Sequence, residues 1–129
     1  MADYTVESPI RVKVSANKYF SLNLNQYRNA HYFTLNTAKV NYGEIMAPLL
    51  KSIPPLGKVT ITYSLYLKGK KRRDVNNVLT VVDKFLADCL VNAGILNDDD
   101  YSHLDYSVFR FGGFTDKESH VIIEINKVT

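Results

Sequence analysis

The sequence predicts a mixed α/β domain of the α+β kind, with two helices packed on one mixed sheet in the order β-α-β-α-β-β. Short segments alternate apolar and polar residues, which is the period of a half-buried strand. Two longer stretches repeat their apolar residues every three or four positions, as amphipathic helices do. The chain has 129 residues, enough for one compact domain with its own core, so we expect a single domain over residues 1–129.

Four strands are expected from the alternation. Ile10, Val12 and Val14 share a face of the first strand, and the strictest alternation covers residues 59–67. The last two strands are expected at 104–111 and 119–126, with these residues on single faces: Leu104, Tyr106 and Val108, then Val121, Ile123 and Ile125. Because Gly112-Gly113 and a polar loop separate this pair, we expect an antiparallel hairpin.

Two helices are expected between the strands. The first should start near Asn36, and Pro48 should kink it or end it near Ala47 because proline has no amide hydrogen. The second should start after Asp74 as N-cap and stop at Gly94. Residues 21–29 are expected to form a structured loop. The apolar stripes are Leu35, Ala38, Tyr42, Ile45 and Leu49 in the first helix, and Val78, Val82, Phe85 and Cys89 in the second.

Composition limits the functional classes. The net charge of +3 is too small for a polycation, so any nucleic-acid contact must come from a local patch such as residues 68–73. No apolar run approaches the ~20 residues of a membrane span, so no membrane partner is expected. The single cysteine, Cys89, excludes an internal disulfide. With no secretory signal in view, the expected location is the cytoplasm.

Clustered aspartates are the main functional signal. Seven of the nine aspartates lie between Asp74 and Asp105, directly after the basic run that ends at Arg73. Close carboxylates repel one another unless a cation relieves them, and oxygen ligands suit Mg²⁺. Asp74 and the Asp98–Asp100 run should nevertheless lie at opposite ends of a helix of ~27 Å. Either the loop folds back along the helix, or a partner subunit supplies one group.

Each signal also has a purely structural interpretation. Asp74 alone would be an N-cap, Asp98–Asp100 alone a solvated turn, and Lys84 alone a surface lysine. The basic run could blunt an exposed sheet edge. Aromatic residues near a helix start are more often core than base-stacking groups, and the histidines are expected to be structural. The aromatic residues are Tyr27, Tyr32 and Phe33, and the histidines are His31, His103 and His120.

Taken together, the pieces resemble the RusA family of Holliday junction resolvases. That family carries a basic stretch, Asp-x-Asp-Asn, a helix with Lys and Asp-x-Leu, then Ala-Gly and Asp-Asp. A weaker likeness covers residues 21–29. The matching positions here are Lys70-Lys-Arg-Arg-Asp74-Val-Asn76-Asn77, Lys84, Asp88-Cys-Leu90, Ala93-Gly94 and Asp98-Asp99.

The resemblance implies a homodimer that binds four-way DNA junctions and cuts two strands symmetrically with Mg²⁺, Mn²⁺ being a possible substitute. The implied metal ligands are Asp74, Asp98 and Asp99, helped by Asn76 and Asp88, with Lys84 stabilising charge in the transition state. The implied DNA contacts are Lys70, Lys71, Arg72, Arg73 and Arg28.

Two departures from the family pattern leave alternatives open. Asn76 stands where the family has a second aspartate, and Lys84 lies one helical turn beyond the family's lysine. An asparagine offers a carbonyl oxygen to a metal but no negative charge. The alternative functions are therefore a non-catalytic junction-binding protein of the same family, or a protein-interaction module whose acidic loop is only surface.

Overall fold

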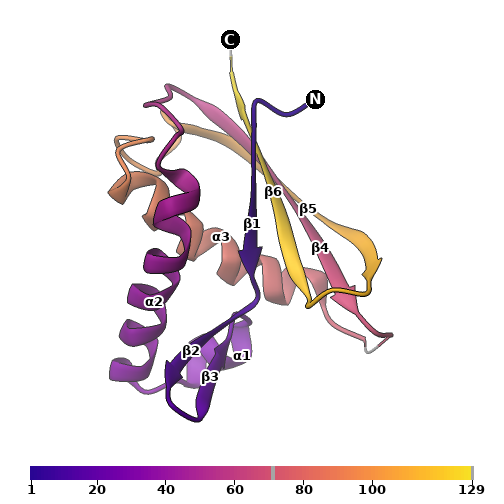
Figure 1. The fold of residues 1–129 in the computed structure, drawn as a ribbon. Helices are drawn as coiled ribbons and strands as arrows, with labels where there is room; N and C mark the ends of the chain where they lie inside the picture. Colours follow the sequence, from indigo (N-terminus) through magenta and orange to yellow (C-terminus); the bar gives the residue numbers. More distant parts are fainter. Residues whose placement is uncertain (71, 129) are drawn as a thin grey trace.

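A mixed four-stranded sheet forms the centre of the protein. The computed structural model describes residues 1–70 and 72–128. The sheet order is β1-β6-β4-β5, with β4 and β5 parallel and the other neighbours antiparallel, while β2 and β3 form a separate hairpin (Figure 1). The elements are β1 (Tyr4–Pro9), β2 (Arg11–Ser15), β3 (Lys18–Ser21), α1 (Leu24–Asn29), α2 (Tyr32–Leu50), β4 (Val59–Lys68), α3 (Val75–Asn92), β5 (Leu104–Thr115) and β6 (His120–Lys127).

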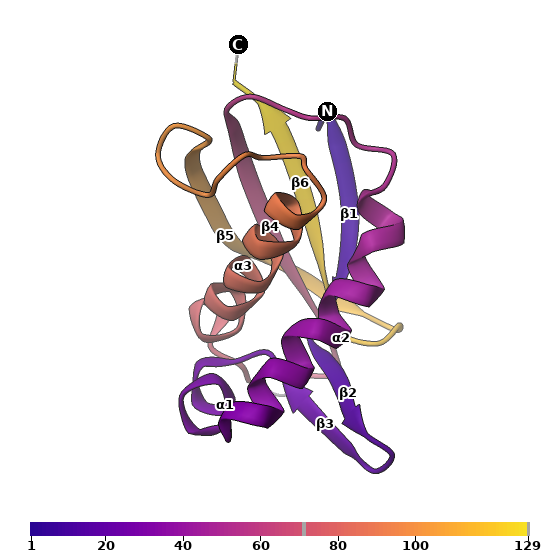
Figure 2. The same ribbon diagram turned by 90° about the vertical axis from the view of Figure 1, so that its left-hand side faces the viewer.

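The two long helices, α2 and α3, cover the same face of the sheet (Figures 1 and 2). The core lies between them and the sheet, where alternate residues of β4 and β6 are buried, including Ile61, Leu65 and Ile123. The α+β class and the mixed sheet agree with the sequence prediction, as does the inward face of β6. Of the helices that the structure describes, none has the length and apolar character that a membrane crossing requires.

The predicted hairpin between the last two strands is wrong. β4 lies between β5 and β6, and α3 is the crossover that joins β4 to its parallel neighbour β5. Gly112 lies inside β5 and not in a turn. A Cβ atom there would come within 2.6 Å of the Tyr66 ring. Glycine therefore lets the Tyr66 ring lie close to the backbone of β5, at the point where the register between β4 and β5 shifts.

The predicted inward face of β5 is also wrong. The register shifts between Val59 and Thr60, which pair with Leu104 and Tyr106. Leu104 and Phe109 pack against the core, whereas Tyr106 and Val108 are 58% and 39% exposed. One extra residue at a bulge moves every later side chain to the other face of a strand.

The first helix is longer than predicted and rotated. α2 begins at Tyr32 and passes through Pro48 to Leu50. Pro48 removes one amide donor from the last turn but does not stop the helix, which ends two residues later. Ile45 and Leu49 are exposed, and the buried stripe instead repeats every four residues: Ala38, Tyr42, Met46 and Leu50.

Three elements were not predicted. β1 was not predicted because a polar residue, Ser8, occupies one of its inward positions and interrupts the apolar alternation. Ser8 is fully buried, and its hydroxyl shares a 2.8 Å hydrogen bond with the Tyr42 hydroxyl. Residues 21–29, expected as a loop, contain the end of β3 and the helix α1, whose N-cap Asn23 accepts from the Gln26 amide at 2.8 Å.

Candidate functional site

The start of α3 positions Asp74. Its carboxylate Oδ1 accepts a hydrogen bond from the Asn77 amide at 3.2 Å, which makes Asp74 the N-cap predicted from the sequence. The Asp74 side chain is exposed beside Arg72 and Arg73. Asn77 has a structural role, because its Oδ1 accepts from the Leu24 amide at 2.7 Å and ties α1 to α3.

The second group of carboxylates meets at the other end of α3. Ile95 and Leu96, both buried, anchor the chain after the helix, and the Ile95 amide donates to the Leu90 carbonyl. The loop then brings Asp98 and Asp99 beside Asp88. These three aspartates line a groove of about 420 Å³ between α2 and α3, together with Lys39.

Cys89 lines this groove, and its thiol is unreactive. Burial raises the pKa of its thiol to about 11, and the nearby Asp88 carboxylate adds to the effect. A thiol with that pKa carries almost no thiolate near neutral pH and is neither a nucleophile nor a good metal ligand. This agrees with the core position expected from the sequence.

Asp83, a half-buried aspartate of α3, was not singled out from the sequence. Asp83 accepts a 2.5 Å hydrogen bond from the Tyr63 hydroxyl beneath α3. Burial raises the pKa of Asp83, and the negative charge of Asp99 raises it further. Asp99 is therefore near enough to α3 for its charge to act on Asp83.

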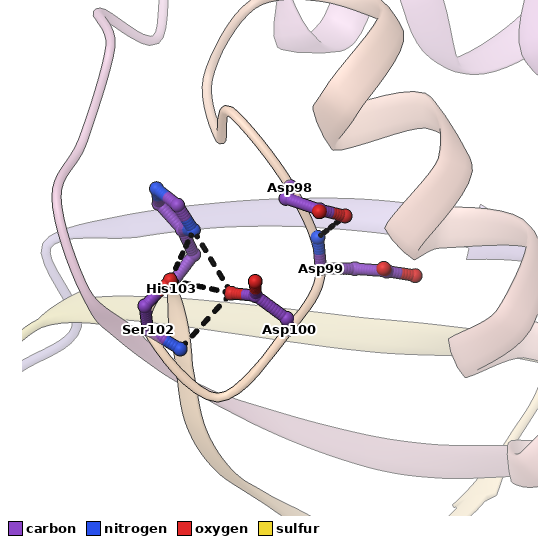
Figure 3. Close-up of polar contacts among 5 residues, drawn as sticks. All are labelled: Asp98, Asp99, Asp100, Ser102 and His103. Carbon is purple, nitrogen blue, oxygen red and sulfur yellow. Dashed lines mark hydrogen bonds and ion pairs between the residues drawn. The ribbon is translucent and has the colours of Figure 1, made fainter.

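Asp100 has a different role from its two neighbours (Figure 3). Its Oδ1 accepts from the Ser102 amide at 3.0 Å and from the Ser102 hydroxyl, and lies 3.2 Å from His103 Nδ1. These bonds lower the pKa of the Asp100 carboxyl. Ser102 and Asp100 both contact the same nitrogen of His103, Nδ1, so this is a closed turn and not a nucleophile-base-acid triad. Figure 3 shows Asp99 directed away from it.

One chain does not bring Asp74 to Asp98 and Asp99. Asp74 precedes Asp83 by nine positions along α3, a distance of about 13 Å along the helix axis. Across residues 1–70 and 72–128, no group of three or more His, Cys, Asp or Glu side chains is placed to hold a metal ion. The oxygen donors have the right chemistry for Mg²⁺, but the described chain does not gather them into a ready site.

Lys84 lies nearer to the groove than to Asp74. It is ten positions beyond Asp74, about 15 Å along the axis, and one turn before Asp88. Its Nζ is 5.9 Å from the centre of the Tyr27 ring, and Lys39 Nζ is at the same distance from that ring. Both ammonium groups therefore lie near the same aromatic ring, and of the two lysines Lys39 lines the groove.

The basic run lies near Arg11 of β2. Lys70, Arg72 and Arg73 are exposed, and Lys71 lies outside the described residues. Arg73 shares a hollow of about 450 Å³ with Lys68 and Arg11. The Arg11 guanidinium lies 4.4 Å from the centre of the Tyr19 ring, a cation–π contact that holds it in place.

Lys39 and Arg11 are site residues that the sequence interpretation missed. Each occupies an ordinary polar position, Lys39 on an amphipathic helix and Arg11 on an alternating strand, so neither carries a local signal. Lys39 is brought to the site by the packing of α2 on α3, and Arg11 by the hollow that it shares with Lys68 and Arg73. Comparison with protein-family models and with curated proteins found no match for this chain.

Proposed function

We propose that the protein is a Mg²⁺-dependent endonuclease that cuts branched DNA, four-way junctions included, as its resemblance to RusA resolvases suggests. The observation that carries the proposal is the convergence of Asp88, Asp98 and Asp99 on one groove beside Lys39. Exposed carboxylates along one groove favour a cation beside them, and a Mg²⁺ ion there could also bind a DNA phosphate.

The basic residues near α3 fit a DNA substrate. Lys70, Arg72 and Arg73 precede Asp74, and Arg28 lies in α1, which packs on α3. Such residues would hold phosphates and set the orientation of the duplex without reading its sequence. Lys84 and Lys39, both near the Tyr27 ring, would stabilise negative charge at the groove.

A homodimer would solve the separation of Asp74 from Asp98 and Asp99. β5 is an edge strand with four exposed large hydrophobic residues: Tyr106, Val108, Phe111 and Phe114. A long apolar edge of this kind invites pairing with another strand. A two-fold axis would set two copies of β5 antiparallel.

Such antiparallel pairing would bring the start of β5 in one copy beside the end of β5 in the other. Lys68 pairs with Thr115, so Asp74 follows shortly after the end where β5 finishes. The Asp98–Asp99 loop leads into the end where β5 begins. In an antiparallel pair, the Asp98–Asp99 loop of a second copy would therefore lie at the same end as Asp74. We propose a metal site completed in this way by two chains.

A non-catalytic junction-binding protein is the second candidate. Asn76 favours it, since this position adds no negative charge, and so does the absence of a gathered three-carboxylate group in the described residues. It would use the same basic residues and bind the same DNA.

Incubation with a labelled four-way junction, with Mg²⁺ or with EDTA, tests the proposal. We expect paired symmetric cuts only with the metal, and a gel shift with or without it. Binding without cuts at any Mg²⁺ or Mn²⁺ concentration would favour the second candidate. A chain that neither binds nor cuts junctions would exclude both and favour a protein-interaction module.

A further inference from the structure

A cluster of exposed aromatic side chains stands outside the groove, at the start of α2. Tyr32 and Phe33 are 74% and 71% exposed, which contradicts the core position expected from the sequence. The His31 ring stacks on Phe33 with centroids 5.4 Å apart, and Tyr32 meets Phe33 edge-on at 5.6 Å. Exposed rings in contact with one another are uncommon on a surface that faces only water.

The backbone holds this cluster in a fixed arrangement. His31 is the N-cap of α2, and its Nδ1 accepts from the Phe33 amide at 3.3 Å. The capping bond positions the His31 ring against Phe33, and the first helical turn fixes Tyr32 beside it. The aromatic faces are thus ordered before any ligand arrives, which lowers the entropic cost of binding.

The surroundings of the cluster are basic. Residues 8–43 contain five Lys or Arg and no Asp or Glu, whereas the rest of the chain has eleven Lys or Arg and thirteen Asp or Glu. This segment folds into β2, β3, α1 and the first half of α2, which lie together at one end of the molecule (Figure 2). A hollow of about 280 Å³ next to His31 is lined by Lys18, Asn25 and Asn29 among others. The charge complements a polyanion.

We infer that His31, Tyr32 and Phe33 form a stacking platform for unpaired bases of DNA, with the surrounding cations holding the phosphates on either side. Unpaired bases expose their π faces, whereas the bases of a duplex already stack on one another. A protein partner would not require an entirely basic surrounding. The inference rests on the proposed action on DNA and adds unpaired bases, such as those of forks and flaps, to the features of branched DNA that the protein recognises.

Binding of oligo-dT and of a duplex of equal length, measured by fluorescence anisotropy, tests the platform. The test variant is Tyr32→Leu/Phe33→Leu, which keeps apolar bulk and helix propensity but removes both rings. Stacking is worth ~1–3 kcal/mol per base, so we expect oligo-dT affinity to fall by about tenfold or more. Duplex affinity should stay within about twofold, because phosphate contacts are retained.

Two further variants act as controls. Tyr32→Phe/Phe33→Tyr retains both rings and should bind oligo-dT as the wild type does. Tyr101→Ala removes a tyrosine that is 86% exposed in an acidic loop, and it should leave oligo-dT binding unchanged. Thermal melting should show that all variants fold.

The outcomes separate this inference from the proposed function. If the wild type binds junctions but the leucine variant keeps its oligo-dT affinity, the platform is refuted and the nuclease proposal stands. If the leucine variant sediments as a monomer where the wild type is a dimer, the rings are an interface, and the inference is again refuted. If the ratio of oligo-dT to duplex affinity falls as expected but no branched substrate is cut, the platform stands and the nuclease proposal fails.

Discussion

The aspartates near α3 have the same kind of side chain but lie in different surroundings. Asp74 caps the helix, Asp83 is held beneath it by Tyr63, and Asp99 is exposed at the groove. Exposure leaves a carboxylate free to meet a cation, whereas a half-buried carboxyl that accepts a hydrogen bond serves the fold. Asp74 can do both. One of its carboxylate oxygens caps the helix, and because the side chain is exposed the carboxylate can still meet a cation.

We expect Asp74→Asn and Asp99→Asn each to lower Mg²⁺-dependent junction cleavage by about a hundredfold or more, since several kcal/mol of charge stabilisation would be lost. Junction affinity should hold or tighten, because a negative charge facing phosphate is removed. Asparagine is also a good N-cap, so Asp74→Asn should stay folded. Asp116→Asn, in the exposed turn before β6, is the matched control. Normal cutting by both variants would exclude the assigned site.

Asp83 predicts a pH dependence of stability. Burial raises its pKa, so the folded state binds this proton more tightly than the unfolded chain does. The stabilising contribution is therefore present below the ordinary aspartate pKa and is lost as pH rises through the raised value. Asp83→Asn should gain stability relative to the wild type between about pH 4 and pH 7. Urea unfolding at both pH values measures this, and a pH-independent difference would contradict it.

At the scale of elements, β5 departs furthest from its sequence pattern. Two register shifts against β4 let one long strand carry Gly112-Gly113 in its interior and turn Tyr106 and Val108 outward. The Tyr66 ring lies over Gly112 and stacks on His120 at 5.4 Å. Gly112 is thus explained by a residue of the neighbouring strand that is far away in sequence.

Gly112→Ala tests this explanation. The new Cβ would lie 2.6 Å from the Tyr66 ring, so the ring would have to leave its place against His120, at a cost of ~1–3 kcal/mol of unfolding free energy. In a Tyr66→Ala background the same change should cost almost nothing. Gly57→Ala, where a Cβ meets nothing within 4 Å, is the control. An equal cost in both backgrounds would mean that another contact requires the glycine.

At the scale of the whole molecule, basic and acidic residues are concentrated in different parts of the chain. The segment that forms β2, β3, α1 and the start of α2 carries basic residues and no acidic ones, while the aspartates gather along α3 and its following loop. A surface divided in this way can hold DNA at one place and bind a cation at another. The separation of Asp74 from Asp98 and Asp99 belongs to this scale, because no local adjustment spans the length of α3.

Mixing two inactive variants tests the proposed two-chain site. In a dimer of one Asp74→Asn chain and one Asp99→Asn chain, a shared site would be intact once and doubly changed once. We expect mixed variants to recover nicking activity near a quarter of the wild-type rate, since about half of the dimers would be mixed. If each site lies within one chain, mixing recovers nothing. Sedimentation equilibrium should give about twice the 14.7 kDa chain mass.

The sequence by itself determined the elements with strong local signals. Strict alternation predicted β4, the Asp74 cap and apolar stripe predicted α3, and the spacing of Val121, Ile123 and Ile125 predicted the buried face of β6. Hydrophobic period and capping depend on near neighbours in the chain, so they can be recognised without a partner element.

Only the tertiary structure decided the strand order, the register of β5 and the grouping of the site. Whether β5 pairs with β6 or with β4 depends on the α3 crossover, and its exposed face depends on bulges against β4. The loop after α3 joins Asp98 and Asp99 to Asp88 and Lys39 but leaves Asp74 at the far end of the helix. Such contacts link residues far apart in the chain, and their geometry is set by packing, which no local pattern encodes.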